Sequence, residues 1–195
     1  MYELFILGLL LERPMHGYLL HQIISVAIGP TRQMSWGALY PLIRRLEEED
    51  LIEHDETAST AHSGHQRKIF RITELGRQRF YWLMLAPGEY NVEYPDLFTI
   101  KLCHIRYVGP KDQLTLLRHH EGYLRFVRDY LQVNRQRVLA HPGIPDEQRP
   151  YILRAIDHRL RLNECDEQWL EGELAQVRAR LEDPQEQHGT ANTVY

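Results

Sequence analysis

Apolar residues recur at helical spacing along most of the chain, and the clearest case lies between residues 34 and 76. Four positions there follow the order i, i+3, i+4, i+7 and share one helix face: Leu39, Leu42, Ile43 and Leu46. Ser35 is a suitable N-cap for this helix. Pro41 conflicts with that start, because a proline beyond the first turn costs about 3 kcal/mol. The regular helix therefore either begins closer to Ala38 or bends at the proline.

Two further helices are expected before this one. The apolar run over residues 4–11 predicts a fully buried helix over residues 2–12, which Pro14 ends. This run lacks the basic flank of a signal peptide and is far shorter than the roughly 20 residues that span a membrane. A second helix is expected over residues 16–28, ended by the Gly-Pro pair at residues 29–30.

A hairpin follows the amphipathic helix. Residues 51–55 and 68–72 alternate as two strands, and residues 57–66 between them have the polar composition of a loop. Thr73 then opens a fourth helix. Three helices followed by a two-stranded hairpin predict a winged helix-turn-helix, with the hairpin as its wing.

Long helices are expected beyond a linker at residues 87–95. They occupy residues 96–107, 112–140 and, starting at residue 146 or 147, the segment up to residue 182. The last of them carries a heptad seam with two polar members, and such a seam needs a partner helix to bury it. The residues expected to form a dimer contact are Leu117, Leu124, Leu131, Ile156, Leu160, Asn163, Leu170, Leu174 and Val177.

These elements predict a mainly α protein with two domains. Residues 1–86 are expected to form a winged helix-turn-helix domain that binds DNA, with three to four helices and a two-stranded wing. Residues 95–182 are expected to form an all-α domain of long helices for dimerisation. Residues 183–195 are polar and interrupted by proline, and they are expected to be a disordered tail.

The overall charge of the chain does not point to a binding partner, but one segment of it is basic. The 195 residues include 23 Lys and Arg against 27 Asp and Glu, so the overall charge does not indicate a polyanionic partner. Within thirteen residues that contain only one acid, however, the chain carries Arg67, Lys68, Arg71, Arg77 and Arg79. Cys103 and Cys165 lie far apart, which predicts neither a disulfide framework nor a Cys-x-x-Cys metal site and favours the reducing cytoplasm.

Several segments resemble the PadR family of bacterial transcriptional regulators. They are residues 7–10 (LGLL), 14–18 (PMHGY), 37–52 (GALYPLIRRLEEEDLI) and 67–76 (RKIFRITELG). Residues 98–102 and the helices after them are similar to the longer PadR subfamily. The resemblance implies a homodimeric repressor that binds a palindromic operator and is released by a small molecule, which is a phenolic acid in the founding members. Ala38 departs from the Ser or Thr that family members often carry, so the hydroxyl that would contact DNA there is missing.

The candidate DNA contacts come from three segments, the start of the second helix, the recognition helix and the wing: His16, Tyr18, Ser35, Trp36, Gly37, Tyr40, Arg44, Ser63, Gly64, Arg67 and Lys68. The N-terminal half of a recognition helix enters the major groove, where Tyr40 can donate to a phosphate or touch a thymine methyl. Cations at the base of a wing can follow the minor groove or the backbone. Simpler interpretations stand beside these: a solvated helix face, a mobile hairpin loop, a core role for Trp36, and packing of Tyr18 against the fourth helix.

Effector residues are expected where the two domains meet. The candidates are Trp82, Tyr90, Tyr94, Phe98, Lys101 and Arg128. Aromatic rings of this kind hold a small aromatic acid, and a cation pairs with its carboxylate. The alternative is that the same side chains simply pack the domain junction.

Patterns for catalysis or metal binding are absent from the sequence. It contains no nucleophile with a base, no glycine-rich phosphate loop and no supported carboxylate pair, so neither an enzyme nor a cofactor is expected. His62 and His65 alone are weak evidence for zinc, and the adjacent His119 and His120 point to different helix faces. Two alternative functions are an interaction protein that uses its coiled helices and a DNA binder without an effector.

Overall fold

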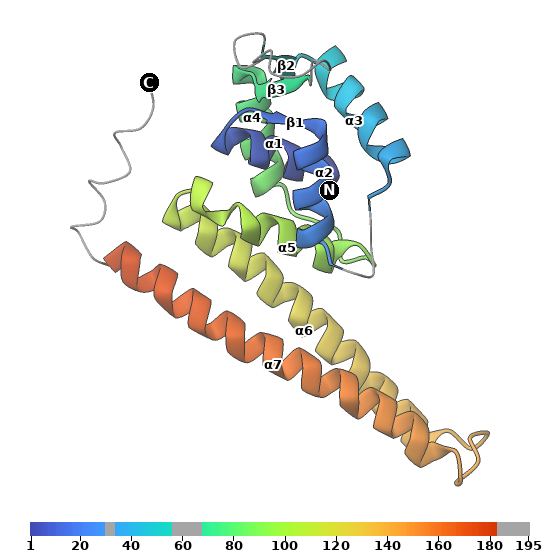
Figure 1. Ribbon diagram of the computed structural model, residues 1–195. Coiled ribbons are helices and arrows are strands. Elements are labelled where there is room, and N and C mark those ends of the chain that lie inside the picture. The colour runs from blue at the N-terminus through green and yellow to red at the C-terminus, as the bar shows by residue number, and fades with distance from the viewer. Residues whose placement is uncertain (30–33, 56–67, 183–195) are drawn as a thin grey trace. The chain divides into compact units, whose positions relative to one another are not determined.

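The computed structural model describes residues 1–29, 34–55 and 68–182, and its contacts divide the chain into two compact units, Met1–Val108 and Gly109–Tyr195 (Figure 1). The first unit extends well beyond residue 86, where we expected the winged-helix domain to end. The reason is visible at His104, whose ring lies 5.3 Å from that of Phe5 in the first helix. The segment after the linker is therefore part of the N-terminal unit.

The N-terminal unit begins with two helices, α1 (Tyr2–Glu12) and α2 (Gly17–Ala27). Residues 4–10 of α1 are all buried, as expected for a helix that is apolar on every side. His16 is the N-cap of α2, because its Nδ1 accepts a hydrogen bond of 3.0 Å from the backbone N–H of Leu19.

Helix α3 (Trp36–Glu48) is the amphipathic helix that the sequence predicts. The Ser35 hydroxyl accepts a hydrogen bond of 3.2 Å from the N–H of Ala38, which confirms Ser35 as the N-cap. The alternative start near Ala38 is not adopted, and Pro41 lies inside the helix. Leu39 and the two apolar residues four and seven positions later are buried and hold the helix on the unit.

The strands form a three-stranded antiparallel sheet in the order β1-β3-β2, rather than a two-stranded wing. The expected pair is present as β2 (Ile52–His54) and β3 (Ile69–Ile72). The additional strand, β1 (Met15–His16), pairs with β3 immediately before α2. Two residues are too few for an alternating pattern, so only the pairing with a distant segment reveals this strand.

Helix α4 (Glu74–Leu85) follows the sheet directly and is capped by Thr73, whose hydroxyl accepts a hydrogen bond of 3.0 Å from the N–H of Gly76. Gly76 lies so close to β2 that a Cβ there would overlap the carbonyl oxygen of Leu51. After the linker, α5 (Tyr94–Cys103) and a short 3-10 helix, η1 (Ile105–Tyr107), complete the unit.

The second unit is a hairpin of two long helices, α6 (Pro110–Ala140) and α7 (Arg149–Glu182). The helices lie side by side along their lengths (Figure 1). Arg135 pairs with Asp157 near the turn, whereas Arg180 bonds Gln113 at the far end, so the two helices are antiparallel.

The heptad seam is buried inside this hairpin, which corrects the expected dimer contact. Leu117, Leu124, Leu131, Asn163, Leu170, Leu174 and Val177 are buried within the chain, and Ile156 and Leu160 are half-buried. The amide of Asn163 donates a hydrogen bond of 3.2 Å to the carbonyl of Leu124 across the seam. These side chains already have a partner helix in the same chain, so a second copy would have to bind elsewhere on the hairpin.

Candidate nucleic-acid interface

Five rings gather where the starts of α2 and α3 meet, and we call them the aromatic cluster: His16, Tyr18, His21, Trp36 and Tyr40. His21 stacks on Trp36 with ring centroids 4.0 Å apart and an interplanar angle of 10°. Tyr18 and Tyr40 lie 5.8 and 5.7 Å from Trp36. The rings thus form a nearly continuous surface beside the first turn of α3.

The cluster decides two alternatives that the sequence leaves open. Trp36 is 38% exposed, so it is a surface residue rather than a core aromatic. Tyr18 is 54% exposed and stacks on Trp36 instead of packing against α4. His21, whose Nε2 lies 2.7 Å from the carbonyl oxygen of Met34, was not predicted. Its position three residues after Tyr18 on α2 is the sequence signal that would have found it.

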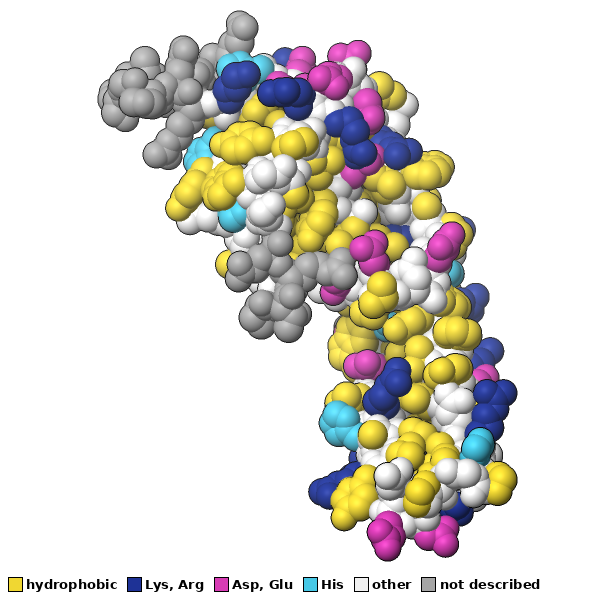
Figure 2. Space-filling model, turned by 90° about the vertical axis from the view of Figure 1, so that its right-hand side faces the viewer, with side chains coloured by type: hydrophobic (Ala, Val, Ile, Leu, Met, Phe, Trp, Pro, Cys, Tyr) yellow, Lys and Arg dark blue, Asp and Glu magenta, His cyan; other side chains and the backbone are white. Residues whose placement is uncertain are grey.

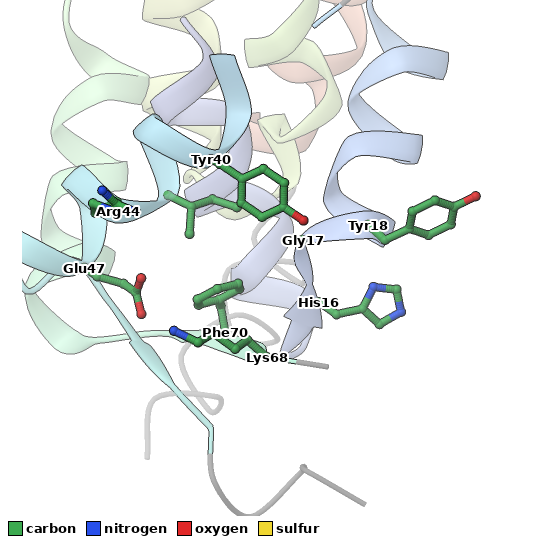
Figure 3. A pocket seen from close by; sticks show the side chains of 9 residues that line it. His16, Gly17, Tyr18, Tyr40, Arg44, Glu47, Lys68 and Phe70 are labelled. Carbon is green, nitrogen blue, oxygen red and sulfur yellow. The ribbon is translucent and has the colours of Figure 1, made fainter. Parts of the chain in front are cut away.

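A hollow of about 560 Å³ lies next to the cluster, between α3, β3 and the β1–α2 junction (Figure 3). Its walls are His16, Gly17, Tyr18, Tyr40, Ile43, Arg44, Glu47, Lys68 and Phe70. In Figure 3, Tyr40 lies above Phe70 and Lys68, Arg44 and Glu47 lie at one end, and His16 and Tyr18 lie at the other. Five predicted DNA contacts, from three separate segments, therefore surround one depression.

The structure shows that some cations of the N-terminal unit are already paired with carboxylates of the chain, whereas others line the hollow. Arg79 forms an ion pair of 2.7 Å with Glu3, which also pairs with Arg45, and Arg71 pairs with Glu53 across the sheet at 3.0 Å. These guanidinium groups are held by carboxylates of the chain itself. Lys68 and Arg44 instead line the hollow.

The remaining predicted contacts are at the first turn of α3 or outside the described residues. Ser35 and Gly37 are exposed at the start of α3, where the Ser35 hydroxyl serves as the cap. Ser63, Gly64 and Arg67 fall in residues 56–67, outside the described part of the chain. Figure 2, in which α3 faces the viewer, shows hydrophobic, His and Lys or Arg side chains together on this unit.

The expected effector residues form a buried helix face rather than an open pocket wall. Tyr94, Phe98 and Lys101 share one face of α5 at i, i+4, i+7, and all three are buried. The ammonium of Lys101 donates a hydrogen bond of 2.6 Å to the carbonyl of Ala86, and burial lowers its pKa to about 8.

The other expected effector residues have partners of their own or lie on the surface. Trp82 is exposed and lies under the guanidinium of Arg79 at 4.6 Å, while Tyr90 contacts the ring of Tyr94. Arg128 belongs to the hairpin unit, where it pairs with Glu167 at 2.9 Å.

Metal-ligand clusters and membrane-spanning helices are both absent from the described residues. No three His, Cys, Asp or Glu side chains come together there as metal ligands. None of the helices in the same residues has the length and apolar composition that crossing a bilayer requires.

Comparison with known proteins gives a family match in the N-terminal part of the chain. The model of the PadR-like family of transcriptional regulators matches residues 6–81. An uncharacterised protein from Lysinibacillus sphaericus is 36% identical over 93 residues, which cover 48% of this chain and 83% of that protein.

Solved structures of PadR and a PadR-like regulator also match most of the chain, at lower identity. The Bacillus subtilis PadR complex with operator DNA is 20% identical, with 90% of this chain and 98% of that chain covered and a TM-score of 0.42. The Bacillus subtilis PadR complex with p-coumaric acid has the same identity and coverage, with a TM-score of 0.39. A PadR-like regulator from Bacillus cereus is 20% identical, with 92% and 99% covered and a TM-score of 0.38.

Proposed function

Because the chain belongs to the PadR-like family of transcriptional regulators, we propose that it acts in the cytoplasm as a homodimeric repressor that binds a palindromic operator. The observation that carries this proposal is the hollow beside α3. It brings Tyr40 and Arg44 of the recognition helix together with Lys68 at the base of the wing. A recognition helix and a wing act on neighbouring grooves of one duplex, so their contact groups have to converge in this way.

The hollow has the chemistry of a site for the DNA backbone. Arg44 and Lys68 supply positive charge, and the hydroxyls of Tyr18 and Tyr40 supply neutral donors at its edge. Glu47 is the one acidic residue among the described residues that line it. A phosphate between the two cations would fix the register of α3, while the first turn of α3 faces the bases.

A palindromic operator requires two copies of α3 about 34 Å apart, one DNA turn, and the hairpin unit offers surface for the dimer contact. Its outer faces carry exposed apolar side chains, among them Tyr130 and Val133 on α6 and Ile152 and Leu162 on α7. Figure 2 shows hydrophobic side chains along the hairpin between charged ones. We propose these outer faces as the dimer contact, because a second copy would bury the exposed apolar side chains of both helices.

A sedimentation experiment tests the dimer. Tyr130→Glu and Leu162→Glu place a charge on the outer faces and are expected to convert the dimer to a monomer with unchanged helix content. Lys111→Glu, a charge change at the start of α6, serves as the control. A monomeric wild-type chain at micromolar concentration, or variants that remain dimeric, would contradict the proposed contact.

Release from DNA by a small aromatic acid is the finer part of the proposal. Lys101 supports it, since it is a cation with a lowered pKa on the same helix face as Tyr94 and Phe98. A bound carboxylate would replace the carbonyl of Ala86 as the partner of the ammonium. Titration calorimetry of the wild-type chain and Lys101→Met with a panel of aromatic acids tests this. Heats that are equal for both proteins, or absent throughout the panel, would remove the aromatic acid from the proposal.

DNA binding itself is tested by mobility shift with the region upstream of the chain's own gene. With about three to five cationic contacts per subunit, the affinity should fall by about 10³ to 10⁵ between 50 and 200 mM salt. Arg44→Ala and Lys68→Ala should each lower the slope of log K against log salt by about 2, because each removes one phosphate contact per subunit.

Arg45→Ala is the matched control, because this neighbouring arginine of α3 is already paired with Glu3. Its salt slope is expected to stay close to that of the wild type. A flat salt response of the wild-type chain would contradict operator binding and favour an interaction protein that uses its helices. Normal binding without any response to aromatic acids would favour a DNA binder that needs no effector.

A further inference from the structure

The first two turns of α3 lack the side chains that usually read bases by paired hydrogen bonds. Residues 36–43 contain no Arg, Lys, Asn, Gln, Asp or Glu, and Arg44 comes only in the third turn. The exposed side chains at the start are those of Trp36, Tyr40 and the small residues between them. Bidentate recognition of guanine or adenine needs Arg, Lys, Asn or Gln. The N-terminal half of this helix must therefore recognise DNA in another way.

The aromatic cluster is rigid and open at the position where a base edge would approach. Trp36 is stacked on His21. The His21 ring is in turn held by its hydrogen bond to the carbonyl of Met34, just before α3. Gly37 is not required by packing, since a Cβ there would meet only the hydroxyl oxygen of Ser35 at 3.8 Å. A glycine inside a helix costs roughly 0.5–1 kcal/mol, and here it keeps the first turn of α3 free of a side chain next to Trp36 in the chain.

We propose that the aromatic cluster reads thymine through its 5-methyl group, with Trp36 and Tyr40 as specificity residues and His21 as the residue that positions Trp36. Thymine is the only standard base that presents a methyl group in the major groove, and apolar contact is the established way to recognise it. The stacked rings lose little conformational freedom when they bind, because they are already held. This inference rests on the proposed function, because it assumes that α3 lies in the major groove.

The experiment compares one duplex in two chemical forms. The full-length chain first selects a preferred sequence from a pool of random duplexes, and that duplex is then prepared with thymine or with deoxyuridine, which lacks only the methyl group. Each methyl that becomes buried should contribute about fourfold in affinity, so one contacted thymine per half-site predicts a loss of about sixteenfold for a dimer.

Variants connect this loss to particular residues. Trp36→Ser should lose most of the discrimination between the two duplexes, whereas Trp36→Phe keeps a ring and should keep most of it. Tyr40→Phe should retain the preference for thymine, because it removes only the hydroxyl. His21→Phe keeps a ring that can stack on Trp36 and should keep the discrimination. His21→Gln keeps an amide donor for the carbonyl of Met34 but has no ring. Of these two variants, His21→Gln should therefore be the one that lowers the discrimination. Thermal unfolding of each variant shows whether the fold is intact.

The outcomes separate this inference from the proposed function. Selection of a sequence that binds equally well with thymine and deoxyuridine overturns the thymine inference and leaves operator binding standing. A loss on deoxyuridine that is the same in Trp36→Ser as in the wild type also overturns it, because another residue would then contact the methyl. Failure to select or bind any duplex overturns both.

Discussion

His104 should make the N-terminal unit lose stability in mild acid. Its ring is only 3% exposed, lies 5.3 and 5.9 Å from the rings of Phe5 and Phe80, and covers Gly8 so closely that a Cβ there would be 2.5 Å from Nε2. Among the described residues whose rings contact it, Tyr107 is the one other titratable group. Burial in this apolar surrounding lowers the pKa of His104 from 6.5 to about 4.

The direction and the size of the stability change follow from the difference between the pKa of His104 in the unfolded and in the folded chain. Between pH 6.5 and about 4 the unfolded chain binds a proton at this residue and the folded chain does not, so the stability falls as the pH falls through this range. Each pKa unit is worth 1.36 kcal/mol, which makes the total loss about 3 kcal/mol at pH 4. Above pH 6.5 His104 should have no effect on the pH dependence.

The assay is urea unfolding at pH 7.5 and 4.5, followed by tryptophan fluorescence. A Trp169→Phe background leaves only the tryptophans of the N-terminal unit. His104→Leu should lose much less stability between the two pH values than its parent. His120→Leu is the control, because that histidine also has a pKa of about 4 but belongs to the hairpin unit. An equal loss of stability in His104→Leu and its parent would refute the reasoning.

Four further substitutions test the packing. Gly76→Ala should lower the melting temperature by an amount equivalent to about 2 kcal/mol or more, because its Cβ would overlap the carbonyl of Leu51. Gly172→Ala is the control and should raise the melting temperature slightly, because its Cβ would meet no described atom within 4 Å. Pro41→Ala should raise the free energy of unfolding, measured with urea, by up to about 3 kcal/mol, since the proline lies inside a helix. A decrease would show that the proline is needed for packing. Asn163→Leu removes a buried amide and should change the unfolding free energy of the hairpin by less than about 1 kcal/mol, so a larger loss in denaturation would assign the amide a structural role.

The local elements were predictable from the sequence because their causes are local. A continuous apolar run identified α1, and helical spacing identified α3 and the two long helices. The cap Ser35 was recognised from its side chain and is confirmed, and the fourth helix opens at Thr73 as expected. A cap acts on amides two or three residues away, and apolar periodicity is visible in a short window. The mainly α winged-helix class follows from the order of these elements.

The partner of each element was not predictable in the same way. The heptad seam of α7 indicates that a helix must cover it, but the pattern is the same whether that helix belongs to a second copy or to the same chain. The hairpin turn decides the matter in favour of α6. Strand β1 likewise exists only because Met15 lies opposite Phe70, 55 positions further along the chain.

The candidate site also has features that the sequence determined and features that only the tertiary structure determined. The sequence by itself determined that Trp36, Tyr40 and Arg44 lie on the outer side of an amphipathic helix, because 3.6-residue periodicity assigns every side chain to a face. Only the tertiary structure decided that His21 stacks on Trp36 and that Lys68 joins Arg44 around one hollow. It also decided that Arg71 is held by a carboxylate of the chain. The reason is physical: a face is set within one turn of helix, whereas a cluster or an ion pair depends on which distant segments the buried core brings together.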